Sequence, residues 1–472
     1  MSTTPILLWF RRDFRLSDHP ALAAATARGG PVVPVFITDD LVHDLGAAPK
    51  WRLSLALSQF ADALEAQGSR MILRRGVALD VIRGLIQETG ARGVYWSRAY
   101  DPASQLRDSK IKSALKGDGI EAKSFPGHLL FEPWTVETKT GGFYRVYTPF
   151  WNAVKNRDVP APLSTSCALA APDILPQSDD LEKCQLGRAM NRGAAVVRPF
   201  VRLGEVAARD RLNHFLAHGI ADYASNRDLP YVDGTSCLSE NLSLGEISPR
   251  QCWHAALAAL HEGKQGAETF LKELVWREFA YHLLHHTPHI IERNWKTDWD
   301  AFPWNEDAQA TKVLRWQQGR TGIPFVDAAM REMYVTGRMH NRGRMIVASY
   351  LCKHLMSHWK IGMDWFEQCL IDWDPASNAM GWQWSAGSGP DATPYFRVFN
   401  PVTQLDKFDK NRAYVSRFLA EGHRNPHADA LAYFKAVPRS WQLDPGAPYP
   451  APVVGAEDGR KAALAAYENR AF

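Results

Sequence analysis

The sequence predicts an N-terminal α/β domain with a Rossmann-like parallel sheet, followed by a larger all-helical domain. Short apolar runs alternate with helical patterns over the first part of the chain, and helical periodicity dominates the last part. Between them, residues 159–199 are rich in Pro, Ala and Ser. The 472 residues are enough for two or three domains. We expect an α/β domain at 1–131, an interdomain linker at 132–199 and a helical domain at 200–472.

The expected elements of the first domain follow in chain order. Apolar runs at 6–10, 32–37, 71–73 and 94–96 are typical of short strands buried on both faces of a parallel sheet. Apolar residues recur at helical spacing over 53–64 and 81–86. No G-x-G-x-x-G follows the first run, and no G-x-x-x-x-G-K-[ST] is present. Ordinary dinucleotide and triphosphate sites are therefore not indicated.

The composition and periodicity of the chain change after the first domain. Residues 159–199 are interpreted as a long connection without packed structure, because prolines recur through them. Beyond it, Pro249, Pro288 and Pro324 mark helix boundaries.

Composition excludes several classes of protein. Hydrophobic residues make up 46% and charged residues 22%, as in globular chains. No apolar run approaches the ~18 residues of a membrane span, so we expect a soluble protein without a membrane partner. Six cysteines, Cys167 among them, lie scattered without C-x-x-C spacing. This pattern favours reduced thiols in a reducing compartment such as the cytoplasm, and no metal site.

Tryptophan is unusually common. The chain has 17, and eleven lie between Trp253 and Trp384. A hydrophobic core does not need so many indoles. Residues 320–360 hold seven Lys and Arg, whereas residues 361–396 hold five acids and no Lys or Arg. The two blocks are consistent with a phosphate-binding surface beside an internally paired pocket, or with two ordinary solvated helix faces.

Three segments could carry chemistry. Glu273, Trp276 and Arg277 share one helix face, which could line a pocket for a planar ring; the alternative is a surface Glu–Arg pair. Asn341 and Arg342 each share a face with Met345, while Arg344 points elsewhere and is free to meet an acid.

The third segment has the highest density of candidate functional residues. Asp372–Asn378 fails the pattern of a calcium loop, having neither the turn glycine nor the final Glu. Trp382 and Trp384 follow it, and indoles in contact with one another can pass an electron or stack on bases.

Together these segments resemble the photolyase and cryptochrome family, most closely its class I cyclobutane pyrimidine dimer photolyases. The matching pieces occur in family order from the first strand past residue 400. They are Trp9–Arg15, Asp233–Ser239, Glu273–Phe279, Met339–Arg342, Gly381–Trp384, and Pro394–Arg397 with Asn400 and Pro401.

The resemblance implies a folded FAD within the helical domain. Arg344 is expected to pair with Asp372, and Asn378 to face N5 of the flavin. Cys237 stands where several relatives have Arg. The implied cofactor-binding residues are Tyr223, Thr235, Ser236, Cys237, Leu238, Ser239, Arg344, Asp372, Trp373, Asp374 and Asn378.

The implied activity is repair of pyrimidine dimers in damaged DNA by a monomer. Blue light excites the reduced, anionic FAD, which lends an electron to a dimer flipped from the duplex. Glu273 is expected to hydrogen-bond the dimer. The other implied DNA-binding residues are Arg227, Trp276, Arg277, Asn341, Arg342, Met345, Trp384 and Gln404.

Two accessory features also follow from the resemblance. Trp382, Trp359 and Trp304 match a chain that carries electrons between the flavin and the surface. An antenna chromophore is expected in the first domain. Ser104 stands where folate-binding relatives have an acid, so a deazaflavin, a folate or no antenna all stay open.

Rival readings are a cryptochrome photoreceptor, a single-strand-preferring photolyase and a flavoprotein that never touches DNA. Asn378 and the absence of a long tail after Tyr449 favour a photolyase over a photoreceptor. Gly343 is shared with the single-strand type.

Overall fold

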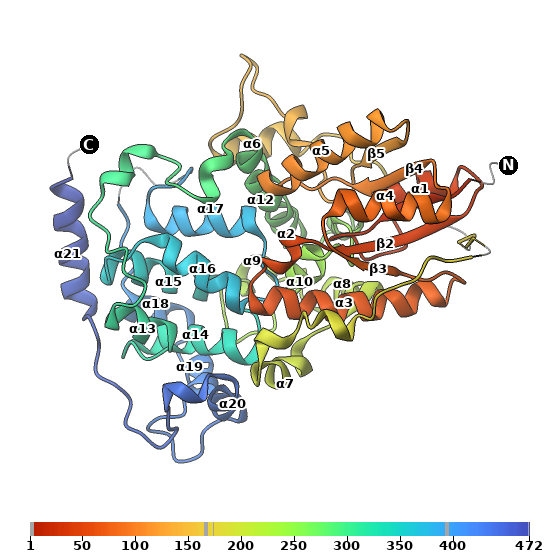
Figure 1. Cartoon of the computed structure of the whole chain (residues 1–472). Coiled ribbons are helices and arrows are strands. Elements are labelled where there is room, and N and C mark those ends of the chain that lie inside the picture. The colour runs from red at the N-terminus through yellow and green to blue at the C-terminus, as the bar shows by residue number, and fades with distance from the viewer. Residues whose placement is uncertain (1–3, 165–168, 173, 392–395, 471) are drawn as a thin grey trace.

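The computed structural model describes residues 4–164, 169–172, 174–391, 396–470 and 472. Cys167, Pro394 and Tyr395 lie outside them. The fold is a parallel sheet domain beside a larger helical body, as the sequence predicts (Figure 1). Within the described part, no helix combines the length and apolar character that a bilayer crossing requires.

The sheet has the order β3-β2-β1-β4-β5, and all neighbouring pairs are parallel. Successive side chains of a strand point to opposite faces, so both faces of the central strands are buried. Helices α1 and α3 cover one face, and α4 and α5 cover the other. The elements are β1 (Ile6–Trp9), α1 (Pro20–Thr26), β2 (Val32–Thr38), α2 (Asp40–His43), α3 (Ala47–Glu65), β3 (Ile72–Arg75), α4 (Ala78–Thr89), β4 (Gly93–Ser97), α5 (Pro102–Gly117) and β5 (Glu121–Phe125).

The four predicted strands are confirmed, with ends shifted by up to two residues. Strand β5 was not predicted. It lies at the edge of the sheet and none of its residues is fully buried, so its sequence Glu-Ala-Lys-Ser-Phe lacks an apolar run.

The helical body occupies the rest of the chain, with α12 and α17 in contact near its centre. Its helices are α6 (Tyr147–Val154), α7 (Gly193–Val197), α8 (Gly204–His218), α9 (Tyr223–Asn226), α10 (Ser239–Ser243), α11 (Pro249–His261), α12 (Ala267–His286), α13 (Thr311–Gln317), α14 (Pro324–Thr336), α15 (Asn341–Ser349), α16 (Trp359–Cys369), α17 (Pro375–Ala386), α18 (Pro401–Phe408), α19 (Ala413–Phe418), α20 (Ala428–Ala436) and α21 (Ala456–Glu468).

The segment 159–199 is more ordered than predicted. It contains helix α7, and Leu186 and Val197 are buried in hydrophobic clusters. The backbone also bonds to the sheet domain, where Val32 donates to the carbonyl of Ala170 at 2.8 Å. The expectation of an unpacked connection was wrong because isolated apolar residues among prolines give no periodic signal.

Buried arginines join the two domains. Arg52 of α3 is fully buried, and its guanidinium reaches Glu240 at 2.9 Å and Glu246 at 2.5 Å in the helical body. Arg12 donates to the carbonyl of Ser243 at 2.7 Å, and Arg15 donates to that of Gly245 at 2.9 Å. These contacts fix the sheet domain against α10 and the segment that follows it.

Candidate functional site

One cavity of about 950 Å³ lies within the helical body. That volume is at the upper end of the range for small-molecule and cofactor sites. The loop 230–239 and helices α12, α15 and α17 supply most of its walls. In the described part of the chain, no group of three or more His, Cys, Asp or Glu side chains is placed to hold a metal ion.

The structure brings most of the predicted residues to this one cavity. Those that line it are Tyr223, Arg227, Thr235, Ser236, Cys237, Leu238, Ser239, Glu273, Trp276, Arg277, Asn341, Arg344, Met345, Asp372, Asp374, Asn378, Trp382 and Trp384.

The predicted pair between the basic and acidic blocks is present. Nη2 of Arg344 reaches the two oxygens of Asp372 at 2.7 and 3.0 Å. Nε of Arg344 donates to the carbonyl of Met339 at 2.9 Å, which orients the guanidinium. Asp372 is 6% exposed, so this ion pair is largely shielded from water.

Asp374 caps helix α17. Its side chain accepts from the backbone N–H of Ser377 at 2.8 Å, as an N-cap residue does. Burial acts to raise its pKa, but nearby Arg12, Arg277 and a 2.5 Å hydrogen bond from Tyr281 keep the pKa below its usual value. One turn later, Asn378 Nδ2 donates to the carbonyl of Asp374 at 2.9 Å. The cap therefore holds the Asn378 side chain against the cavity wall.

Glu273 lies on α12 in an ion pair with Arg227. Burial raises the pKa of Glu273, an effect that Arg227 opposes. Trp276, one turn along, stacks on Tyr147 of α6 with ring centroids 3.6 Å apart. Tyr147 is a positioning residue that sequence reasoning missed, because nothing in its local pattern distinguishes it from a core aromatic.

The expected phosphate-binding arginines already have partners. Arg277 donates to the carbonyl of His128 at 2.7 Å, and Arg342 pairs with Asp228 at 2.7 Å. Arg342 and Gln404 are not among the described residues that line the cavity.

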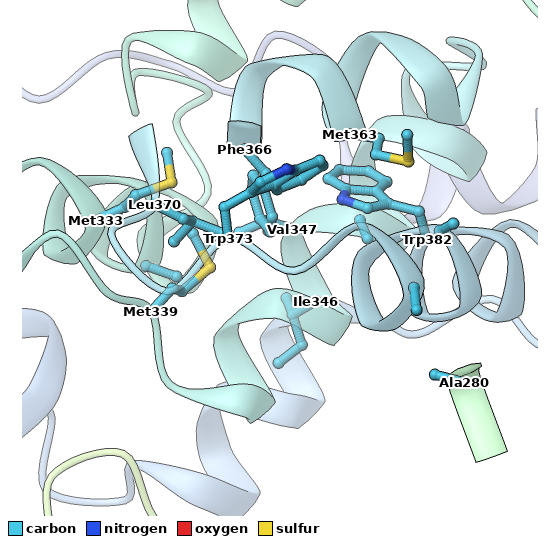
Figure 2. Close-up of a cluster of buried hydrophobic side chains, with 14 of the residues drawn as sticks. Ala280, Met333, Met339, Ile346, Val347, Met363, Phe366, Leu370, Trp373 and Trp382 are labelled. Carbon is cyan, nitrogen blue, oxygen red and sulfur yellow. The ribbon is translucent and has the colours of Figure 1, made fainter. Parts of the chain in front are cut away.

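Trp382 lines the cavity and is 3% exposed, whereas Trp373 is not among the described residues that line it. Figure 2 shows both tryptophans in the hydrophobic core near Phe366. Adding a Cβ to Gly362 of α16 would bring it within 2.1 Å of the Trp382 ring. The indole of Trp382 therefore packs directly on the helix that begins with Trp359.

Trp359 is fully buried, and its Nε1 donates to Oδ1 of Asn294 at 2.8 Å. The ring of His358 lies 5.3 Å from the rings of both Trp359 and Trp304. Trp304 is only 8% exposed and stacks on Trp299 at 5.6 Å. The expected outer member of the chain is thus itself a buried residue.

Comparison with known proteins places this geometry in a family. Residues 6–166 match the description "DNA photolyase", and residues 270–469 match "FAD binding domain of DNA photolyase". A deoxyribodipyrimidine photo-lyase of Agrobacterium fabrum is 43% identical, over 99% of this chain and 98% of its own. The chain belongs to the DNA photolyase family.

Two solved structures of the photolyase and cryptochrome family extend the comparison. A structure described as a bacterial class III photolyase from Agrobacterium tumefaciens has a TM-score of 0.91 at 42% identity, covering 99% of this chain and 98% of that one. A Synechocystis cryptochrome has a TM-score of 0.85 at 28% identity, covering 98% and 99%. Membership of class I is not confirmed by these matches.

The cavity residues fit the FAD that this domain implies. Nε1 of Trp382 and Nη1 of Arg338 are buried and have no hydrogen-bond partner among the described residues, and both side chains line the cavity. Buried polar atoms are normally paired, so orphan donors at a cavity wall indicate a bound group with acceptor atoms.

Proposed function

We propose that this chain repairs cyclobutane pyrimidine dimers in DNA, using light absorbed by FAD in the cavity. The observation that carries the proposal is that one cavity is lined both by residues suited to a flavin and by residues suited to a pair of bases. The loop 235–239 with Asp372 and Asn378 suits a flavin cofactor, and Glu273 with Trp276 and Trp384 suits a flipped pair of bases. A protein that bound only a flavin would not need the second set.

The cavity residues have different roles on its cofactor side and its lesion side. Bound FAD, in its reduced anionic form, supplies the electron that light makes available to the lesion. Asp372 and Arg344 form a neutral pair that holds the cofactor side of the cavity without adding net charge. Asn378 presents a neutral amide there.

The lesion side combines two tryptophans with the carboxyl group of Glu273. Trp276 and Trp384 exclude water and stack on the extruded bases, which a damaged step releases at lower cost than a normal one. Glu273 hydrogen-bonds the dimer, and burial, which raises its pKa against the effect of Arg227, lowers the cost of placing a proton on this carboxylate when negative charge develops on the bases. Asn341 and Met345 lie at the same wall.

DNA phosphates contact Arg227 and Arg277 at the cavity, and Arg342 and Gln404 outside its lining. The three arginines have internal partners in the free protein, so DNA binding competes with those contacts. We expect binding that weakens with salt, because phosphate contacts release counterions.

Trp382, Trp359 and Trp304 serve a separate purpose, the light-driven reduction of oxidised flavin. Trp382 begins the path at the cavity wall, and Trp359 and Trp304 lead away from it through the ring of His358. Repair by already reduced enzyme does not need this path.

Gly343 favours one second candidate, a photolyase that prefers single strands. A Cβ at this position would lie 3.0 Å from Cβ of Ala329 and 3.2 Å from Met339, so the usual larger residue does not fit without displacement. A cryptochrome-type photoreceptor is the other alternative, and the fold it shares with this chain does not exclude it.

The test compares repair in light and dark. Purified protein loaded with FAD and chemically reduced is mixed with thymine-dimer DNA, double- or single-stranded, under blue light. We expect loss of dimers in the light only. Repair of single strands alone would favour the second candidate, and no repair of either would favour the photoreceptor. Class I membership, the antenna chromophore, the monomeric state and the cytoplasmic location stay predictions.

A further inference from the structure

The part of the cavity that the loop 235–239 lines also carries an arginine that sequence analysis did not assign. Arg338 follows α14 and lines the cavity together with Cys237 and Leu238. Its Nη1 is buried and has no hydrogen-bond partner among the described residues. Its ion-pair partner is Oε1 of Glu240, and the distance of 3.9 Å between Nη1 and this oxygen is too long for a hydrogen bond.

The acids around Arg338 are already engaged. Glu240 is bound by Arg52 at 2.9 Å and also by Arg211. Asp372 is bound by Arg344 at 2.7 Å. The remaining neighbour, Glu332, accepts from the N–H of His340 at 3.0 Å and the hydroxyl of Tyr414 at 2.6 Å, and burial raises its pKa.

The other arginines of the described cavity wall each hydrogen-bond a carboxylate. They are Arg227 with Glu273, Arg277 with Glu278, Arg344 with Asp372 and Arg417 with Asp429. Arg338 is therefore the cavity arginine whose charge is least compensated at close range. Burial acts to lower its pKa, yet Cys237, Glu240 and Asp372 hold the pKa above the ordinary value, so the side chain stays cationic.

The backbone presents Arg338 at a fixed place. The hydroxyl of Thr336 accepts from the N–H of Arg338 at 3.1 Å and donates to its carbonyl at 3.0 Å. Gly337, at φ 71°, has no room for a Cβ, which would meet Ile371 and Val197 at 2.8 Å. The turn therefore packs against the core at Gly337 and presents Arg338 to the cavity.

The facing loop lacks a cation of its own. Residues 235–239 offer hydroxyls, a thiol and backbone N–H groups, but no Lys or Arg. Cys237 has a left-handed φ of 51° and the next residue is right-handed, a sequence of conformations that turns successive N–H groups into an anion-binding hollow. Such a hollow lowers the cost of binding a phosphate but does not neutralise it.

We propose that Arg338 binds the diphosphate of FAD and supplies the positive charge that the loop 235–239 lacks. The inference rests on the proposed FAD site. It makes Arg338 a cofactor-binding residue that fixes the dinucleotide, rather than a participant in the light reaction. The same chemistry could in principle serve a DNA phosphate, and the experiment separates the two sources.

The test measures Kd of the apoprotein for FAD, without DNA, for wild type and Arg338→Gln. Losing one charge-assisted contact should raise Kd by about 10- to 100-fold. Arg338→Lys should recover part of the affinity, since it keeps the charge without the planar fork. The salt dependence of FAD binding should be weaker in Arg338→Gln than in wild type.

Arg417→Gln is the matched control, because Arg417 lines the same cavity but is already paired with Asp429 at 2.6 Å. Equal Kd values for Arg338→Gln and wild type, or an equal loss in Arg417→Gln, would overturn the proposal. If Arg338→Gln does not fold, Arg338→Lys is measured instead, and a Kd for FAD equal to that of wild type would contradict the proposal.

A second arm titrates FAD-loaded protein with dimer-containing DNA. Arg338→Gln saturated with FAD should bind DNA as wild type does. A variant that binds FAD normally and DNA poorly would assign Arg338 to DNA instead. Wild type that binds FAD but repairs nothing would remove the proposed function and leave this inference intact.

Discussion

At the residue scale, the account depends on a buried acid facing the lesion. Glu273 is the carboxylate that the described lesion side offers beside its two tryptophans, and its charge is partly balanced by Arg227. Glu273→Gln keeps the size of the side chain and removes the acidic proton. Repair per absorbed photon should fall by roughly 10-fold or more, because the amide still donates a hydrogen bond but cannot supply a proton to the charged dimer.

The absorbance of bound FAD should be the same in Glu273→Gln and wild type. Glu268→Gln is a fitting control, because Glu268 lies on the same helix, is exposed and pairs only with Lys272. Unaltered repair by Glu273→Gln would remove the role assigned to this carboxyl.

Trp382 tests the electron path. Trp382→Phe should slow photoreduction of oxidised flavin by at least about 10-fold, since phenylalanine is far harder to oxidise than indole. Repair by chemically reduced enzyme should be retained. Absorption spectra recorded under continuous illumination measure the first effect and dimer loss measures the second.

Trp373→Phe provides the comparison, because Trp373 is a buried indole that does not line the cavity. If Trp382→Phe photoreduces as fast as wild type, Trp382 is not the first member of the path.

Individual residues were predictable to the extent that they belong to contiguous motifs. The pair of Arg344 with Asp372 and the cavity positions of Glu273 and Asn378 were expected from sequence. The absence of a hydrogen-bond partner for Nη1 of Arg338 among the described residues was not, because it follows from which acids Arg52, Arg211 and Arg344 occupy in three dimensions. Trp373 is not among the described residues that line the cavity, which fits a chain segment whose neighbouring side chains face opposite sides.

At the scale of elements, α16 and α17 are held in contact by a glycine. The Trp382 ring of α17 occupies the space where Gly362 of α16 would carry a Cβ. Gly362→Ala should lower the free energy of unfolding by about 1–3 kcal/mol through overpacking. It should also slow photoreduction, since the ring must shift.

Gly381→Ala offers a control within α17 itself. No atom lies within 4 Å of a Cβ built there, so this helical substitution should be neutral or stabilising by about 0.5–1 kcal/mol. Denaturant unfolding of both variants measures the difference. A destabilisation of Gly381→Ala equal to that of Gly362→Ala would show that packing on Trp382 is not the cause.

Elements with a strong period were predicted and those without one were not. The central strands are continuous apolar runs, and the long helices carry their apolar residues at helical spacing. The edge strand β5 and the short helix α7 do not, because their burial is partial or is supplied by neighbours far away in sequence. Figure 1 shows α7 beside elements from other parts of the chain.

At the scale of the whole molecule, Glu278 ties α12 to the segment that leaves the sheet domain. Its carboxylate accepts from the backbone N–H groups of Leu130 at 2.8 Å and Phe131 at 3.1 Å. Burial raises its pKa from 4.5 to about 7, against the opposing effect of Arg277. The folded protein therefore holds this proton more tightly than the unfolded chain does.

The sign of the pH dependence follows. Between pH 4.5 and about 7 the unfolded chain loses the proton first, so this group lowers folding stability as pH rises and adds no further change above that range. The fall should amount to about 1–3 kcal/mol. Glu278→Gln should flatten the stability profile over this window, measured by denaturant unfolding at several pH values, whereas Glu88→Gln on the surface should not. Parallel profiles for Glu278→Gln and wild type would contradict the prediction.

The central claim is that one cavity holds the flavin and the lesion within electron-transfer distance. It is tested most directly by the fluorescence of reduced FAD bound to the protein, recorded while thymine-dimer DNA is added in weak light. The account predicts that dimer-containing DNA quenches this fluorescence and that undamaged DNA of the same sequence does not. Tight binding of the damaged DNA with unchanged fluorescence would contradict it.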